Sequence, residues 1–202
     1  MKDAHVTAAL RSRRAFGAAM VSMLLVEASG ASTAAFKAGT FDPPRPAPDF
    51  SLQGSNGHEL RISDFRGKVV LLAFGYTSCT EVCPVTLATF AQARRKLTAA
   101  AADVQIVYVT VDPQRDVPER LRKFLGSFDR TFIGGTGTEA QLAAVRKQYG
   151  VTATKIPYED GYVYAHSSFT YLIDRAGRIR ALMPYGHSPA DYANDLTLLL
   201  KE

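Results

Sequence analysis

Residues 69–84 read VVLLAFGYTSCTEVCP, and this stretch decides the fold that the sequence predicts. Residues 69–74 are continuously apolar, which is typical of a central strand buried on both faces. The only two cysteines, Cys79 and Cys83, follow this strand, and apolar residues at helical spacing begin after Pro84. A dithiol placed between a central strand and the helix it feeds indicates a thioredoxin-like fold.

The segments on either side extend this pattern. A second apolar strand is predicted at 104–111, and Thr138 and Ser188 are placed to cap two of the helices. We therefore predict an α/β, thioredoxin-like domain with a mixed central sheet, flanking helices, an N-terminal hairpin and an inserted strand-helix. The predicted elements are a hairpin at 50–52 and 59–62, helices at 84–97 and 118–128, the inserted strand 132–133 and helix 138–149, a hairpin at 168–173 and 178–183, and a closing helix at 188–200.

The first 35 residues are predicted to be an export signal or an N-terminal membrane anchor. Positive charge at 11–14 precedes twelve apolar residues, 15–26, a stretch too short to span a bilayer comfortably. Residues 12–16, SRRAF, also resemble the twin-arginine signal for export of folded proteins. This places the protein in the periplasm or on the outer face of a bacterial inner membrane, with the N-terminal segment as its membrane attachment in the second case.

Residues 36–49 are rich in proline and are predicted to be an extended linker. The folded domain is then predicted to cover residues 50–202. The formal net charge of +5 is mild, and no basic run is interleaved with aromatic residues. A nucleic-acid partner is therefore not expected.

The spacing of Cys79 and Cys83 favours a chemical role over a structural one. A bond between them would close almost no loop and would add little stability. Their place near a helix N-terminus favours the thiolate, which is both a nucleophile and a metal ligand. An exported protein works in an oxidising compartment, yet this chain has no distant cysteine pair for structural bridging.

His166 is the residue that separates a metal site from a redox dithiol. Redox thioredoxins usually have two residues between their cysteines and a cis-proline facing them, whereas this chain has three residues and no proline immediately before the strand near 168. In a thioredoxin-like fold, His166 would take the place of that proline and face both sulfurs. Two thiolates and one imidazole suit copper and, to a lesser degree, zinc. His58 and His187 are expected to lie in a solvent-facing hairpin and a loop.

Three blocks of sequence together resemble the Sco/SenC family of copper-binding assembly factors for cytochrome c oxidase. They are residues 67–84, residues 109–118, which read VTVDPQRDVP, and residues 166–174, which read HSSFTYLID. The similarity covers roughly residues 47–200. By matching position, it implies that Cys79, Cys83 and His166 are the copper ligands.

The resemblance implies a copper chaperone for the binuclear copper site of the oxidase, with the metal held by two thiolates and one imidazole. The implied partners are the copper-bearing oxidase subunit and an upstream copper donor. The alternative is an enzyme, a thiol–disulfide oxidoreductase that reduces the oxidase cysteines before metallation, in which Cys79 attacks and Cys83 resolves the mixed disulfide. A peroxide-reducing protein is disfavoured because Glu81 would oppose a thiolate.

Two acids follow the second central strand. Asp112 is expected to be a turn residue before Pro113. The alternative, which the family resemblance implies for some members, is that it lies near the metal. Arg115 and Asp116 are expected to mark a helix start and to form a surface ion pair.

Overall fold

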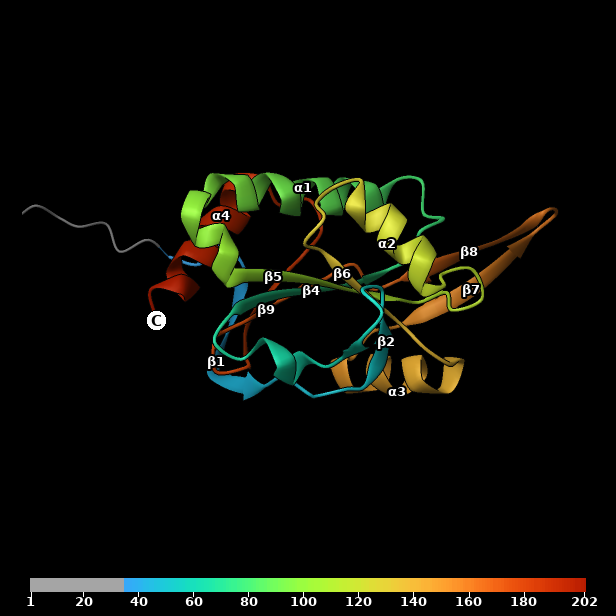
Figure 1. Ribbon diagram of the computed structural model, residues 1–202, viewed down its shortest axis with the longest axis horizontal. Coiled ribbons are helices and arrows are strands. Elements are labelled where there is room, and N and C mark those ends of the chain that lie inside the picture. Colours follow the sequence, from blue (N-terminus) through green and yellow to red (C-terminus); the bar gives the residue numbers. More distant parts are fainter. Residues whose placement is uncertain (1–34) are drawn as a thin grey trace, which may run out of the picture. The chain divides into compact units, whose positions relative to one another are not determined.

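A sheet of eight strands, ordered β1-β10-β9-β4-β5-β6-β2-β3, forms the centre of the computed structural model, which describes residues 35–202 (Figure 1). The central strands β4 (Val69–Gly75) and β5 (Val104–Thr110) run parallel and are buried along their whole length. Both lie where the apolar run at 69–74 and the strand predicted at 104–111 place them, which confirms this part of the prediction.

The remaining elements complete a mixed sheet with helices on both faces. Figure 1 shows α1, α2 and α4 over one face and α3 over the other. The expected mixed α/β architecture is confirmed. The other strands are β1 (Gly39–Pro46), β2 (Leu52–Gly54), β3 (Glu59–Leu60), β6 (Ile133–Thr136), β7 (Ala153–Tyr158), β8 (Gly161–His166), β9 (Thr170–Ile173) and β10 (Arg178–Met183); the α-helices are α1 (Val82–Lys96), α2 (Pro118–Gly126), α3 (Glu139–Tyr149) and α4 (Pro189–Leu200); the 3-10 helices are η1 (Ile62–Phe65) and η2 (Thr98–Asp103).

The ends of α3 and α4 follow the predicted capping chemistry. The Thr138 hydroxyl accepts a hydrogen bond from the Gln141 backbone N–H, and Gly150 ends α3 in the left-handed region at φ 67°. Ser188 caps α4 in the same way, with Pro189 in its first turn. A side-chain acceptor at the N-terminus satisfies a backbone donor that has no partner within the helix.

The prediction that residues 36–49 are a linker is wrong, because β1 lies at the edge of the main sheet and pairs antiparallel with β10. The register shifts between Thr40 and Arg45, so the central prolines fall where an edge strand can lack backbone donors. The preceding residues are also anchored. The backbone N–H groups of Lys37 and Ala38 donate to the buried Asp195 carboxylate of α4, at 2.7 and 2.9 Å.

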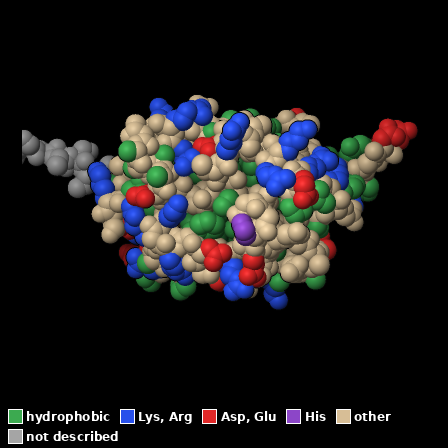
Figure 2. All heavy atoms as spheres, in the orientation of Figure 1, with side chains coloured by type: hydrophobic (Ala, Val, Ile, Leu, Met, Phe, Trp, Pro, Cys, Tyr) green, Lys and Arg blue, Asp and Glu red, His purple; other side chains and the backbone are tan. Residues whose placement is uncertain are grey.

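The hairpin formed by β7 and β8 was also not predicted from the sequence. These strands pair only with each other and form a separate two-stranded sheet. The hairpin extends away from the main sheet in Figure 1, and Figure 2 shows acidic side chains at its tip, where Glu159 and Asp160 are exposed. Strand β7 is exposed along nearly its whole length, and in β8 exposed residues alternate with the half-buried Tyr162, Tyr164 and His166, so the hairpin has no fully buried face.

The predicted signal or anchor falls almost entirely on residues 1–34, which lie outside the described residues. Within residues 35–202, no helix has the length and apolar character needed to cross a bilayer.

Candidate metal centre

The loop between β4 and α1 places the two cysteines in different surroundings. Strand β4 ends at Gly75 and α1 begins at Val82, so Cys79 lies in the loop and Cys83 in the first turn of the helix. Cys79 is half-buried, whereas Cys83 is only 3% exposed. The backbone N–H of Cys83 points at the Cys79 sulfur, with 3.4 Å between nitrogen and Sγ. Both cysteines are free thiols.

This geometry shifts the two thiol pKa values in opposite directions. The Cys83 thiol donates to the Cys79 sulfur, and together with the backbone N–H groups of residues 81–83 it lowers the pKa of Cys79 to about 5 against the effect of burial. The pKa of Cys83 is raised by its bond to Cys79 and by burial. The pKa of Cys79 is therefore lowered despite the neighbouring acid, and the backbone N–H of Glu81 contributes to the lowering.

His166 ends β8 and brings an imidazole to the same place. Its Nε2 lies 3.9 Å from Cys83 Sγ, although the two residues are 83 positions apart in the sequence. Its Nδ1 lies 2.9 Å from the carbonyl oxygen of Ser167. A carbonyl oxygen can only accept, so this contact places the ring proton on Nδ1 and leaves the Nε2 lone pair directed toward the sulfur.

This pair fits two ligands of one metal ion. Sulfur at about 2.3 Å and nitrogen at about 2.0 Å from a shared tetrahedral or trigonal ion would lie about 3.5–3.8 Å apart, close to the observed 3.9 Å. Among residues 35–202, however, no three His, Cys, Asp or Glu side chains are already grouped closely enough to form a metal site. The structure therefore brings Cys83 and His166 together, with Cys79 joined to them through its contact with the Cys83 backbone.

The other two predicted histidine positions hold as expected. His58 is exposed near the first hairpin, and His187 lies before α4 with its Nδ1 3.6 Å from the Asp191 carboxylate.

Cys79 faces open space, whereas Cys83 and His166 face a tight interior. A groove of about 420 Å³ lies beside Cys79. Its other walls are residues Tyr76, Ser78, Thr80, Glu81, Val82, Tyr158, Val163 and Tyr164. Cys83 and His166 instead line a narrow cleft together with the buried Tyr108. A reagent or partner can therefore approach Cys79 without entering the core.

The strand that carries this loop leaves no room for a side chain at Gly75. A Cβ there would overlap the hydroxyl of Tyr108 and would lie 2.8 Å from Cys83 Sγ. The Tyr108 hydroxyl and the Cys83 sulfur therefore both lie against the β4 backbone at Gly75. Sequence reasoning did not identify Tyr108, because a tyrosine within an apolar strand gives no signal of a polar neighbour.

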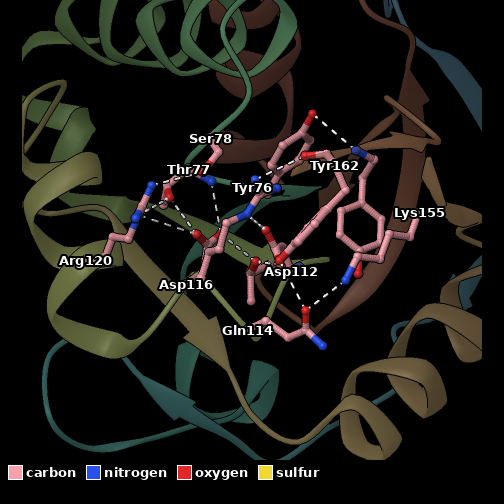
Figure 3. A network of polar contacts seen from close by, with 12 residues as sticks. Tyr76, Thr77, Ser78, Asp112, Gln114, Asp116, Arg120, Lys155 and Tyr162 are labelled. Atoms are coloured by element: carbon pink, nitrogen blue, oxygen red, sulfur yellow. Dashed lines mark hydrogen bonds and ion pairs between the residues drawn. The ribbon is translucent and has the colours of Figure 1, made fainter. Parts of the chain in front are cut away.

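Two buried carboxylates, Asp112 and Asp116, also contact the surroundings of the site (Figure 3). The expectation of a surface ion pair between Arg115 and Asp116 is wrong, because Asp116 is fully buried and the ion pair joins Arg115 to Asp112. Asp112 has the expected turn role, since its carbonyl accepts from the backbone N–H groups of Arg115 and Asp116. Among the described residues, its carboxylate contacts Arg115 and Tyr162, not the cysteines or His166.

Comparison with known proteins matches residues 39–201 to a family described as SCO1/SenC. An SCO2-like protein of Rickettsia felis is 36% identical over 133 residues, which are 64% of this chain and 65% of that protein. The match therefore spans less than two thirds of that relative's length.

Two solved structures show the same fold. The structure of Bradyrhizobium japonicum ScoI with copper bound is 34% identical and aligns with a TM-score of 0.71, covering 76% of this chain and 99% of that one. A structure described as revealing a disulfide switch in BsSco, a member of the Sco family of cytochrome c oxidase assembly proteins, is 26% identical with a TM-score of 0.62, covering 78% and 95%. The predicted thioredoxin-like fold class is confirmed.

Proposed function

Because this chain belongs to the SCO1/SenC family, we propose that it binds copper and serves the assembly of the binuclear copper site of cytochrome c oxidase. Cys79, Cys83 and His166 are the proposed ligands. The proposed partners are the copper-bearing oxidase subunit and an upstream copper donor. We further propose that the protein is exported, by the twin-arginine route or an ordinary signal, to the periplasm or the outer face of the inner membrane.

The observation that carries this proposal is the approach of His166 Nε2 to Cys83 Sγ at 3.9 Å. A redox dithiol needs no imidazole with a free lone pair at that position, whereas a metal ligand does. Thiolate ligands favour Cu(I) and imidazole suits Cu(II), so this donor set accepts either oxidation state.

The two thiols would contribute differently to binding and release. With a pKa of about 5, Cys79 is already a thiolate at neutral pH, so only the Cys83 proton has to leave when metal binds. Cys79 also faces the open groove, where ligands from a partner could replace it one at a time. Cys83 and His166 would hold the ion from the buried side.

A thiol–disulfide oxidoreductase remains the second candidate, and the low pKa and exposure of Cys79 favour it. The Cys79 thiolate would attack one sulfur of a partner disulfide and release the other as a thiolate. Cys83, after losing its proton, would attack Cys79 and release the second partner thiol. The partner gains two electrons, and this chain is left with a Cys79–Cys83 disulfide.

Copper titration of the reduced, purified chain separates these functions. We expect one equivalent of Cu(II) to bind with a thiolate-to-copper charge-transfer absorption, and His166→Ala to abolish or strongly alter that absorption. His187→Ala is the matched control and should leave it unchanged, because His187 lies in the loop before α4.

An unchanged spectrum and affinity in His166→Ala would remove His166 from the ligand set and favour the oxidoreductase. In that case, the His166→Ala variant should also reduce a disulfide peptide at the rate of the unmodified chain.

A further inference from the structure

The residues at the end of β5, 112–116, contact both of the separate elements that carry the proposed ligands (Figure 3). One element is the loop that leads from β4 to Cys79. The other is the β7–β8 hairpin, which ends at His166.

Asp116 holds the cysteine loop. Its buried carboxylate accepts hydrogen bonds from the Thr77 backbone N–H at 2.9 Å, the Thr77 hydroxyl at 2.5 Å and the Thr110 hydroxyl at 2.6 Å. Arg120 of α2 adds two contacts to the same loop: it donates to the Thr77 hydroxyl at 2.7 Å and to the Ser78 hydroxyl at 2.9 Å. The two residues immediately before Cys79 are therefore fixed by side chains outside their own loop.

Asp112 holds the hairpin. The Tyr162 hydroxyl of β8 donates to its carboxylate at 2.9 Å. Arg115 forms an ion pair with Asp112, donates to the Tyr162 carbonyl at 3.1 Å and lies 3.9 Å from the centre of the Tyr162 ring. Gln114 adds a contact to the other strand, since it accepts from Lys155 of β7 at 2.8 Å.

These side-chain contacts take the place of backbone hydrogen bonds to the main sheet, which would otherwise fix the hairpin. The strands β7 and β8 share no pairing with the eight-stranded sheet, so the position of His166 depends on side-chain and loop contacts. Two carboxylates without exposed surface are costly to bury unless they are hydrogen-bonded, and both direct their bonds toward the ligand-bearing elements.

We propose that residues 112–116 hold the dithiol loop and the imidazole hairpin in fixed positions relative to each other, with Asp116 and Asp112 as the positioning residues. Asp116 sets the position of Cys79 through Thr77, and Asp112 sets the position of His166 through Arg115 and Tyr162. The positioning itself is a property of the metal-free chain; only its consequence for copper rests on the proposed function.

Hydrogen–deuterium exchange of the metal-free chain tests the two contacts separately. Thr77→Val removes only the side-chain bonds to Asp116 and Arg120, and it should accelerate exchange at amides 77–81 at least tenfold. Tyr162→Phe removes only the hydroxyl that binds Asp112, and it should accelerate exchange at amides 161–166. Thr197→Val is the control, because it removes a hydroxyl that donates to the Ala193 carbonyl within α4, and it should leave both exchange rates unchanged.

Copper binding supplies the second measurement. Thr77→Val and Tyr162→Phe should each weaken Cu(II) binding at least fivefold and shift the thiolate charge-transfer absorption, while Thr197→Val should do neither. If the Asp116→Asn variant folds, it should show the same changes in exchange and copper binding as Thr77→Val. If it does not fold, Thr77→Val alone tests the role of Asp116.

The outcomes are distinguishable. Exchange rates within twofold of the unmodified chain in both Thr77→Val and Tyr162→Phe would overturn the positioning role. Failure of the unmodified chain to bind copper would overturn the proposed function, and the exchange measurement would still decide the positioning role.

Discussion

At the scale of single residues, Cys79 and Cys83 lie four positions apart and are two chemically different thiols. Cys79 lies before the helix, where backbone N–H groups and the neighbouring thiol stabilise its negative charge. Cys83 lies inside the first turn, where its hydrogen bond to Cys79 and its burial raise the pKa and oppose ionisation. One is therefore a nucleophile at neutral pH and the other a proton donor.

Alkylation kinetics of the reduced, metal-free chain should show this difference. Because the pKa of Cys79 is lowered to about 5, its thiolate is lost only as the pH falls through that value. We expect the rate with iodoacetamide to rise through pH 5 and to be constant from about pH 6.5 to 8. Cys83→Ala removes the thiol that donates to Cys79 and should move the midpoint upward. A midpoint above pH 7 in the unmodified chain would contradict the assignment.

Gly75→Ala tests the close approach of Tyr108 and Cys83 to the β4 backbone. The added Cβ would overlap the Tyr108 hydroxyl, so we expect a loss of about 1–3 kcal/mol in the free energy of unfolding by urea. Tyr108→Phe removes that hydroxyl and should recover part of the loss in the double variant.

Gly126→Ala is the matched control, because nothing lies within 4 Å of the added Cβ in α2, and it should be neutral or slightly stabilising. Equal effects of the two glycine substitutions would show that Gly75 is not confined.

At the scale of elements, a strand or helix was predicted correctly where the residues of that element alone indicate its structure. The central strands are mostly apolar, and α3 and α4 have caps, so they could be placed from local residues. Strand β1 could not, because its prolines indicate an extended segment while its pairing depends on β10. Strand β7 is exposed and contains Pro157, and in β8 the apolar Val163 and Ala165 are exposed while Tyr162, Tyr164 and His166 are half-buried, so neither periodicity nor composition marked the hairpin.

The same distinction applies to the proposed site. The spacing and helix position of the cysteines could be read directly, and the position of His166 followed from the fold class. The roles of Asp116 and Tyr108 could not be predicted, because their partners are far away in sequence: Thr77 lies 39 residues from Asp116.

Truncation tests whether β1 belongs to the folded domain. A chain of residues 50–202 loses β1 and the two backbone donors to the buried Asp195 carboxylate. We expect it to be less stable to urea than residues 35–202 by about 3 kcal/mol or more, because hydrogen bonds to a buried charge are lost.

A double-mutant cycle with Asp195→Ala serves as the control for this truncation. The substitution should cost less in residues 50–202 than in residues 35–202, since the donors at Lys37 and Ala38 are already absent. Equal stability of the two truncated chains would return residues 36–49 to the role of a linker.

At the scale of the whole molecule, the proposed ligands join elements that the main sheet does not connect. A metal ion bound by Cys79, Cys83 and His166 would link the β4–α1 junction to the separate β7–β8 sheet. A metal ion that binds the folded chain and not the unfolded chain stabilises the folded chain by mass action.

Thermal unfolding with copper should measure this linkage. At a free Cu(I) concentration a thousandfold above the dissociation constant, the expected stabilisation is about 4 kcal/mol, which corresponds to about 8–16 °C in Tm for a chain of this size. Cys83→Ser should lose most of the shift, and His187→Ala should retain it. An equal shift in Cys83→Ser would show that copper stabilises the fold from another site.

The separation of 83 residues between Cys83 and His166 also sets an order in time. A ribosome adding about 5–20 residues per second makes the dithiol roughly 4–17 s before the imidazole. During that interval, a nascent chain offers two sulfurs without the proposed third ligand or the hairpin that carries it. A soft metal ion or an oxidant met then would react with an unfinished site, which is a physical reason for such a chain to receive its metal only after synthesis is complete.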